Sequence, residues 1–299
     1  MAGPLDLVGL TSVMARSAGR PEVLVGLIDG PVAVGHPGLA GRRVVVLRGG
    51  GGRRAGACDA AGGEAPCLHG TFVAGVLSGG RSSGAPGVCP GCTLLVRPIF
   101  AADRPGRRAE PSARAEELAD AVVECVDAGA RVLNLSVAPE QPSSAANRAL
   151  EGALDHAAGR GVVTVVAAGN QGALGSTAIT RHPWTIPVVA YDRRGRPMDL
   201  SNLGRAIGER GLGAPGEAVA SLGAGRRPLV LTGTSAATPF VTGAVALLLS
   251  AFPAASPAQV RAALVGAAGP RGRVVPPLLA AGAAYTALSA VAGDPRRRG

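Results

Sequence analysis

The 299-residue chain contains no lysine and few aromatic residues. Its 30 basic residues are all arginine, they stand against 20 acidic residues, and Phe, Tyr and Trp together make up 2% of the chain. Nucleic-acid binding usually combines a basic patch with aromatic side chains that stack on bases, whereas these arginines are scattered along the sequence. The composition argues against a nucleic-acid partner. The net charge of +10 would instead attract acidic peptides, and this attraction should weaken with salt.

The N-terminal segment lacks a secretory signal. Residues 1–22 contain no charged start followed by a continuous apolar stretch, which export would require. We therefore expect a cytoplasmic protein. Near the other end, residues 274–293 are uncharged and long enough to span a bilayer. Because Pro276, Pro277 and many Ala and Gly residues make this stretch weakly hydrophobic, we favour a helix packed on the domain, with a membrane anchor as the alternative.

The chain has only five cysteines, an odd number. In a cytoplasmic chain the default is reduced thiols, although Cys58 and Cys67 could pair in an oxidising compartment. Cys89 and Cys92 form a C-x-x-C motif. No second pair and no nearby histidine completes a zinc site, and we interpret the motif as a loop before a strand, with zinc or a redox site as less favoured alternatives.

Apolar runs alternate with helical patterns along the chain. Hydrophobic residues make up 47% of the sequence, and runs at 23–28, 93–99, 132–135, 162–167 and 186–190 read as buried strands. Helices are predicted over 113–128 and 145–158, and exposed Gly-, Arg- and Pro-rich loops over 49–66 and 101–111. This alternation predicts an α/β domain with a parallel sheet. We place it at residues 23–293, after an N-terminal extension (1–22) and before a basic tail (294–299).

Ser235 stands where a helix is predicted to begin. It lies in the run GTSAATP, directly before the apolar stretch 240–249. The first turn of a helix leaves backbone N–H groups unpaired and carries partial positive charge, so negative charge that develops beside Ser235 would meet hydrogen-bond donors. Ser235 is therefore a candidate nucleophile, although a simple capping turn would give the same pattern.

A serine nucleophile needs a base, and the chain offers one with a matching carboxylate. Asp29 ends the strand predicted at 23–28, and His69 opens the segment HGTFVAG, which we interpret as the start of a helix. An imidazole with a pKa near ~6.5 can take and return the serine proton. A carboxylate on its other nitrogen selects the useful tautomer and stabilises the imidazolium. We expect His69 to be this base, and Asp29 is the carboxylate that the chain offers beside it.

The order Asp, His, Ser is the order of the triad in subtilisin, and the chain resembles the subtilisin-like serine proteases, or subtilases. The resemblance rests on LIDG around Asp29, HGTFVAG around His69, GTSAATP around Ser235 and AAGN ending at Asn170, and it covers residues 23 to about 250. It implies a three-layer fold with a mostly parallel sheet between helices. It also implies that Asp29 selects the tautomer of His69 and stabilises its imidazolium, and that the Asn170 amide and the Ser235 backbone N–H form an oxyanion hole. We expect no cofactor.

Two departures from the family pattern concern the site. Gly30 follows Asp29 where subtilases usually carry Ser or Thr, which removes a hydroxyl that could bond the carboxylate. The resemblance also implies that the segment after 132–135 binds substrate, and we expect Ser136, Val137, Ala138 and Gly169 to contact it. Val137-Ala138-Pro139 replaces the usual Leu-Gly-Gly. Because glycine allows close backbone approach and proline does not, we expect a narrowed pocket that prefers a small side chain.

The resemblance extends to one subfamily. The segment 87–100 ends in Pro-Ile-Phe and, with Ile28-Asp29-Gly30-Pro31 and His36-Pro37, it is similar to subtilases of the cyanobactin-maturation type. Those enzymes cleave leader peptides from ribosomally made precursors. Secreted subtilases generally carry a folding pro-domain, whereas only 28 residues precede Asp29, and we expect folding without one.

The sequence thus predicts a serine endopeptidase that acts through an acyl-enzyme on a peptide or protein substrate, such as a precursor peptide with an acidic leader. The alternative is a catalytically silent subtilase-fold protein that binds peptides without cutting them. Many subtilases hold calcium through oxygen ligands, but residues 79–87 contain no carboxylate. We therefore predict no metal site.

Overall fold

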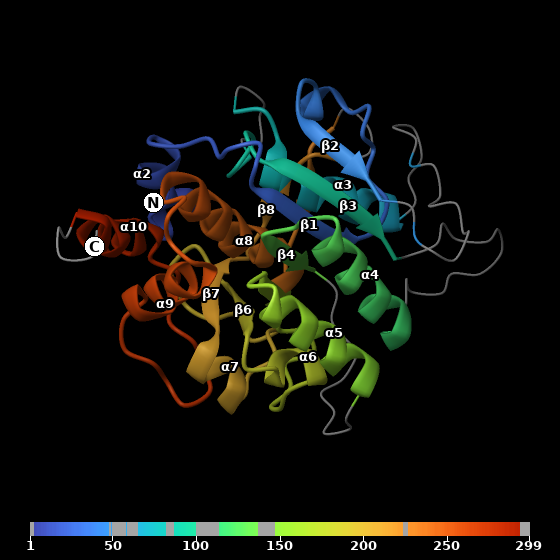
Figure 1. Ribbon diagram of the computed structural model, residues 1–299. Helices are drawn as coiled ribbons and strands as arrows, with labels where there is room; N and C mark the ends of the chain where they lie inside the picture. The colour runs from blue at the N-terminus through green and yellow to red at the C-terminus, as the bar shows by residue number, and fades with distance from the viewer. Residues whose placement is uncertain are drawn as a thin grey trace.

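A computed structural model describes residues 3–47, 49, 58, 65–81, 87–99, 114–136, 147–223 and 227–293. Its centre is a seven-stranded sheet with the strand order β2-β3-β1-β4-β5-β6-β7, in which every neighbouring pair is parallel (Figure 1). The prediction of an α/β fold with a parallel sheet between helices is confirmed.

Five of the nine described strands coincide with the predicted apolar runs, and the other four were not predicted. The sheet consists of β1 (Leu24–Asp29), β2 (Arg43–Val46), β3 (Thr93–Pro98), β4 (Val132–Leu135), β5 (Val163–Ala167), β6 (Thr185–Tyr191) and β7 (Leu212–Pro215). An antiparallel pair, β8 (Val219–Ser221) and β9 (Leu229–Leu231), stands apart. The edge strand β2 is mostly exposed, and β7 reads Leu-Gly-Ala-Pro. The short apolar run of β2 lies between Arg43 and Arg48, and β7 contains Gly and Pro; neither was predicted as a strand.

Ten α-helices and one 3₁₀ turn occur in the described residues. They are α1 (Pro4–Leu7), α2 (Leu10–Met14), the 3₁₀ turn Pro37–Leu39, α3 (Ala65–Ser78), α4 (Ala115–Asp127), α5 (Arg148–Gly159), α6 (Ala178–Arg181), α7 (Arg205–Arg210), α8 (Thr234–Ala251), α9 (Pro257–Ala267) and α10 (Ala281–Gly293). The helices predicted at 113–128 and 145–158 correspond to α4 and α5. The predicted loops at 49–66 and 101–111 lie almost entirely outside the described residues.

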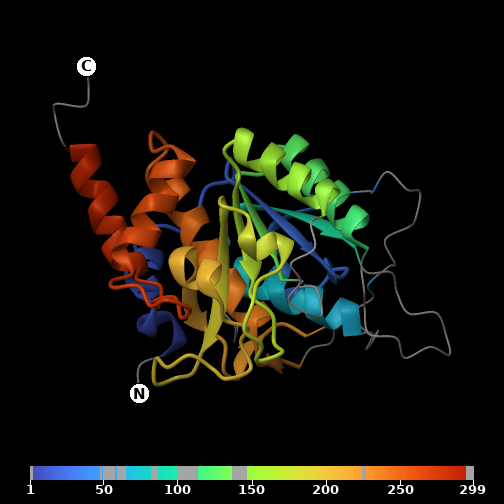
Figure 2. The same ribbon diagram turned by 90° about the horizontal axis from the view of Figure 1, so that it is seen from below.

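Helices cover both faces of the sheet, because side chains alternate between the two faces of a strand. On β3, Leu94 and Val96 join the cluster that contains α3 and α8, whereas Leu95 joins the cluster that contains α4 and α5. Figure 2 shows the two helix pairs on opposite sides of the sheet. Each fully buried Val or Leu side chain contributes about 1.5–3 kcal/mol relative to an exposed one. The two apolar layers therefore stabilise the sheet, and the candidate site lies at one edge of it.

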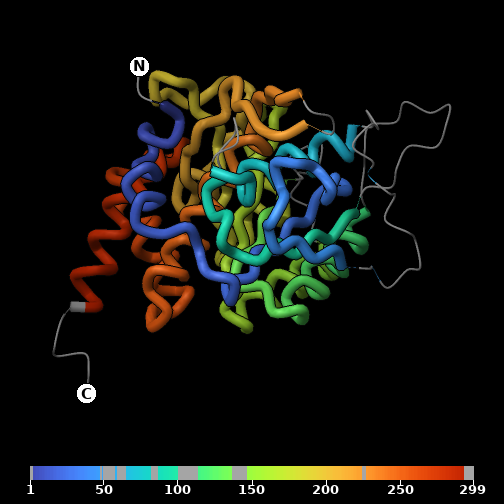
Figure 3. Tube along the Cα trace, turned by 90° about the horizontal axis from the view of Figure 1, so that it is seen from above, coloured from blue at the N-terminus to red at the C-terminus, as the bar shows by residue number. Residues whose placement is uncertain are grey.

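The central helix α8 is long and apolar enough to cross a membrane by length and composition, yet 89% of its apolar window is buried inside the protein. The C-terminal stretch 274–293 contains α10, which packs beside α2 (Figure 3). The backbone N–H of Ala281 donates to the carbonyl of Val8 at 2.9 Å. The expected packed C-terminal helix is present, and it docks on the N-terminal helices.

Candidate active site

Three of the predicted site residues lie at one edge of the sheet. Asp29 is the last residue of β1, Ser136 follows β4, and Asn170 lies shortly after β5. These three strands are neighbours and parallel. Their carboxyl ends therefore meet at the same edge, which is where open α/β sheets usually bind ligands.

Asp29 and His69 form a hydrogen-bonded pair. The Nδ1 of His69 lies 2.6 Å from the Oδ1 of Asp29, which also accepts the backbone N–H of Gly30 at 2.6 Å. The Asp29 side chain is fully buried, whereas that of His69 is 28% exposed. The other carboxylate oxygen, Oδ2, is buried and has no hydrogen-bond partner within the described residues. Gly30 has no side-chain hydroxyl to offer this oxygen.

The surroundings of His69 shift its pKa. Burial by itself lowers the pKa of the imidazole, because a charged ring loses solvation. The negative charge of Asp29 and the hydrogen bond that its carboxylate accepts from the imidazole together raise the pKa by more than burial lowers it, so the pKa of His69 lies above its ordinary value. Asp29 therefore stabilises the imidazolium form, as a base that takes up a proton requires.

The helix that carries His69 begins earlier than predicted. α3 starts at Ala65, so His69 lies in its second turn and does not open it. The prediction of a helix start at His69 was wrong: the helix begins with Ala65 and Pro66, and proline favours the first turn because the N–H that it lacks would be unpaired there.

Two glycines bring α3 against the end of β1. A Cβ atom on Gly30 would lie 1.9 Å from the carbonyl oxygen of Pro66, and one on Gly70 would lie 2.4 Å from the carbonyl oxygen of Gly30. Only residues without a side chain permit this approach. The close contact sets the distance between Asp29 and His69.

Ser235 lies in the first turn of α8, as predicted. The backbone there is tied to β4, since the Oγ of Ser136 donates to the carbonyl of Ser235 at 3.2 Å. The Oγ of Ser235 takes part in no hydrogen bond to any described residue. His69 lies on α3 and Ser235 on α8, and these two helices pack against each other. No hydrogen bond joins the two side chains in the part of the chain that the structure describes. Such bonds are often long before substrate binds.

Asn170 is exposed and held by the residue before Ser235. Its Oδ1 accepts the backbone N–H of Thr234 at 2.9 Å and the Thr234 hydroxyl at 3.0 Å. These two donors orient the amide so that its nitrogen is left for another acceptor. No described residue accepts from that nitrogen, which is the group that an oxyanion hole needs.

Two buried polar residues that the sequence analysis missed support this edge. Asn134 donates to the Oγ of Ser136 at 2.7 Å and accepts the hydroxyl of Thr242 at 2.8 Å, which links β4 to α8. Asn202 accepts the backbone N–H groups of Gln171 and Ala173 at 3.1 and 3.0 Å, which shapes the loop that carries Asn170. Asn134 interrupts an apolar strand, and that interruption was the signal available in the sequence.

The predicted substrate-binding residues divide into two groups. Ser136 lies beside the Ser235 backbone, and Gly169 precedes Asn170 with φ +103°. A Cβ on Gly169 would lie 2.3 Å from the side-chain nitrogen of Asn202, so glycine is required there. Val137 and Ala138 lie outside the described residues.

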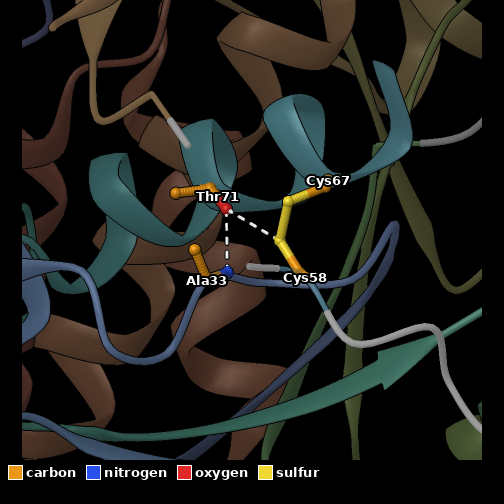
Figure 4. Close-up of a disulfide and its surroundings, with 4 residues drawn as sticks. All are labelled: Ala33, Cys58, Cys67 and Thr71. Atoms are coloured by element: carbon orange, nitrogen blue, oxygen red, sulfur yellow. Dashed lines mark hydrogen bonds between the residues drawn. A yellow bond between two sulfur atoms is a disulfide. The ribbon is translucent and has the colours of Figure 1, made fainter. Parts of the chain in front are cut away.

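A disulfide lies directly before the histidine. Cys58 and Cys67 are bonded, and the Sγ of Cys58 also lies 3.7 Å from the Oγ1 of Thr71 (Figure 4). Thr71 accepts the backbone N–H of Ala33 at 2.9 Å, so it links α3 to the segment after Asp29. The default expectation of reduced thiols was wrong for this pair, because the fold places the two sulfur atoms together.

The other three cysteines, Cys89, Cys92 and Cys125, are unpaired and buried. Cys89 and Cys92 lie in a turn before β3, as expected for the C-x-x-C segment. The hydrogen bond between these two thiols raises the pKa of Cys89 and lowers that of Cys92. Burial raises the pKa of Cys125 to about 12. Among the described residues no group of three or more His, Cys, Asp or Glu side chains could hold a metal ion.

The model of the subtilase family, peptidase S8, matches residues 20–283. The chain belongs to the subtilase family, the subtilisin-like serine proteases. It is 30% identical to subtilisin DY of Bacillus licheniformis over 262 residues, which cover 86% of this chain and 87% of that protein. It is 34% identical to a thermophilic serine proteinase of Bacillus sp. strain AK1 over 184 residues, 61% of this chain and 42% of that one. The thermophilic serine proteinase and two further protease relatives are longer than the region matched: the alignment covers 42%, 50% and 39% of their respective lengths.

Solved structures of maturation proteases share the fold along nearly the whole chain. The patellamide maturation protease PatA superposes with a TM-score of 0.77 at 32% identity, covering 91% of this chain and 98% of that one. The prenylagaramide maturation protease PagA superposes with a TM-score of 0.82 at 28% identity, covering 94% and 98%. The protein is therefore similar in structure to cyanobactin maturation proteases.

Proposed function

We propose that the chain is a serine endopeptidase that uses Ser235 as nucleophile, His69 as general base and Asp29 as the partner of that base. The observation that carries this proposal is the 2.6 Å hydrogen bond between the buried Asp29 carboxylate and His69 Nδ1. It leaves the other ring nitrogen, Nε2, as the proton acceptor. Asp29 contributes by holding this tautomer and by stabilising the imidazolium.

The reaction would run in two halves. Ser235 Oγ attacks the peptide carbonyl while His69 Nε2 takes the hydroxyl proton, and the carbonyl oxygen becomes an oxyanion that accepts from the Asn170 amide and the Ser235 backbone N–H. When the C–N bond breaks, His69 returns the proton to the leaving amine and an ester to Ser235 remains. A water then attacks this ester by the same proton route, which releases the acid and restores the serine.

The substrate we propose is a ribosomally made precursor peptide with an acidic leader. Similarity to the patellamide and prenylagaramide maturation proteases supports a precursor substrate. The net charge of +10 supports an acidic one. Ser136 and Gly169 beside Asn170 and Ser235 are the described residues best placed to contact its backbone.

Covalent labelling of the purified chain by a fluorescent fluorophosphonate tests the catalytic part. We expect labelling that disappears in both Ser235→Ala and His69→Ala and persists in Ser12→Ala, which removes an exposed serine hydroxyl on α2. Folded protein without labelling would favour the alternative, a peptide-binding protein without catalysis. Cleavage of a precursor peptide, compared with the same peptide after its leader Asp and Glu residues are replaced by Asn and Gln, tests the substrate. Equal rates at low salt would refute the acidic preference.

The cytoplasmic location remains a prediction. Thiols in the cytoplasm are kept reduced by glutathione, whereas the structure pairs the half-buried Cys58 with the buried Cys67. Fractionation of producing cells, together with the thiol state of these two residues, tests the location. Recovery outside the cytoplasm with the disulfide intact would contradict it.

A further inference from the structure

A cavity lies at the carboxyl edge of the same sheet, and none of the catalytic candidates lines it. Its volume is about 640 Å³, within the range of small-molecule sites. Tyr191 ends β6 and Pro215 ends β7, so the cavity lies next to β5, the strand that precedes Asn170. The cavity is thus a neighbour of the candidate active site, separate from it.

The cavity combines an apolar interior with an acidic rim. Leu5, Val76 and Phe240 supply apolar surface, and Asp6, Asp192, Glu217 and Arg193 supply charge, three carboxylates against one guanidinium. An apolar body with a positive charge would complement this lining.

The three carboxylates differ in the groups that already bind them. Asp192 forms an ion pair with Arg196 at 2.8 Å. Asp6 accepts the Thr11 hydroxyl and the backbone N–H of Gly3. Glu217 accepts the backbone N–H of Arg193 at 2.9 Å and forms no ion pair within the described ranges. Glu217 is therefore the carboxylate best placed to pair with a bound cation.

The wall of the cavity is hydrogen-bonded to the residues just before Ser235. The backbone N–H of Ala218 donates to the Thr232 hydroxyl at 3.0 Å, and the backbone N–H of Gly233 donates to the carbonyl of Gly216 at 2.9 Å. A Cβ on Gly216 would lie 2.9 Å from the Gly233 carbonyl oxygen. A displacement of residues 216–218 would therefore reach Thr232 and Gly233, which lead into the first turn of α8 and Ser235.

The same wall also touches the helix that carries His69. Ser221, which lines the cavity, donates its hydroxyl to the carbonyl of Phe72 on α3 at 2.8 Å. Val76 on α3 and Phe240 on α8 both face the cavity. Both helices of the candidate active site thus form part of this one hollow.

One residue of the wall is strained. Ala218 has φ +45° and is the one non-glycine residue with positive φ in the described part of the chain. An alanine held in this region costs energy and persists only where the surroundings fix it, which is a common property of binding segments.

We propose that this cavity binds a small organic ammonium ion with a hydrophobic body, paired with Glu217, and that its occupancy changes the reactivity of Ser235. The first part of this proposal, that the cavity binds an ammonium ion, depends only on the residues that line the cavity. The second half rests on the proposed function.

The test of binding uses 4-phenylbutylamine as probe and 4-phenylbutyrate as its matched anion, titrated into the whole chain by calorimetry. We expect saturable binding of the amine and binding of the carboxylate at least about 10-fold weaker. Glu217→Gln should weaken amine binding about 3- to 5-fold, and Ala220→Trp, which places a large side chain at the exposed mouth, should abolish it. Glu116→Gln on the exposed surface of α4 is the matched control and should change nothing.

Either of two results would overturn the binding proposal: the amine fails to saturate, or Glu217→Gln binds it as tightly as Glu116→Gln does. Coupling is measured as the rate of fluorophosphonate labelling with saturating amine, where we expect a change of at least about 3-fold that Ala220→Trp abolishes. An unchanged rate refutes coupling. If the chain is never labelled, the proposed catalytic function fails while the calorimetry still decides binding.

Discussion

Replacing Gly30 by alanine should damage the candidate active site more than its small size suggests. The new Cβ would lie 1.9 Å from the Pro66 carbonyl oxygen, where ordinary contacts begin at 3.4 Å. The backbone of β1 or of α3 must therefore move by about 1.5 Å, the difference between these two distances. The atoms that meet are backbone atoms, so no side-chain rotation relieves the clash. The movement separates the segment that carries Asp29 from the helix that carries His69.

The expected loss is kinetic and thermodynamic. A displacement of about 1 Å in a catalytic group can cost about 10²-fold in rate, and we expect that loss in the fluorophosphonate labelling rate of Gly30→Ala. Overpacking should also lower the free energy of unfolding by about 1–3 kcal/mol, which urea denaturation measures. Gly35→Ala is the control, because Gly35 is in the same loop and a Cβ there would meet nothing within 4 Å.

Gly30→Ala that is folded and labelled at the rate of Gly35→Ala would refute the reasoning. It would mean that the spacing between β1 and α3 does not set the geometry of the Asp29–His69 pair. A second variant checks the same contact from the other side: a Cβ on Gly70 would lie 2.4 Å from the Gly30 carbonyl oxygen, and Gly70→Ala should lose labelling rate as well.

Three further predictions concern the site and its surroundings. Asn170→Ala should lower the peptidase kcat about 10²–10³-fold with little change in KM, and a loss below about 10-fold would count against an oxyanion role. Asp29 raises the pKa of His69 above 6.5, so the imidazole becomes neutral, and able to accept the serine proton, only at a higher pH. The labelling rate should therefore rise with pH, with a midpoint above 6.5. Asp29→Asn should shift this midpoint to lower pH. A wild-type midpoint below 6.5 would contradict this. Replacing Cys58 and Cys67 by serine should cost about 2.7 kcal/mol by the loop-entropy model for a separation of 9 residues. The corresponding fall in Tm is roughly 4 °C by calorimetry, and an unchanged Tm would show that the disulfide adds no stability.

The prediction from sequence succeeded where local pattern determines structure. Asp29 closes an apolar run, and the end of such a run is the end of a buried strand. Ser235 precedes a long apolar stretch, and that stretch is the core helix α8. Helix α3 shows the limit of this reasoning, since the helix starts at Ala65, four residues before the predicted start at His69, and already buries Pro66 and Cys67. Strands β2 and β7 escaped because an exposed edge strand and a short Gly- and Pro-containing strand carry little local signal.

The sequence by itself determined the order Asp29, His69, Ser235, the alternation of strands and helices, and hence the family and the parallel sheet. Only the tertiary structure decided that His69 meets Asp29 through Nδ1 across 40 residues of chain, that Thr234 turns the amide of Asn170, and that Cys58 pairs with Cys67. The reason is physical: strand and helix formation follow from the side chains of neighbouring residues, whereas the direction of a hydrogen bond or the pairing of two sulfur atoms depends on how distant segments pack.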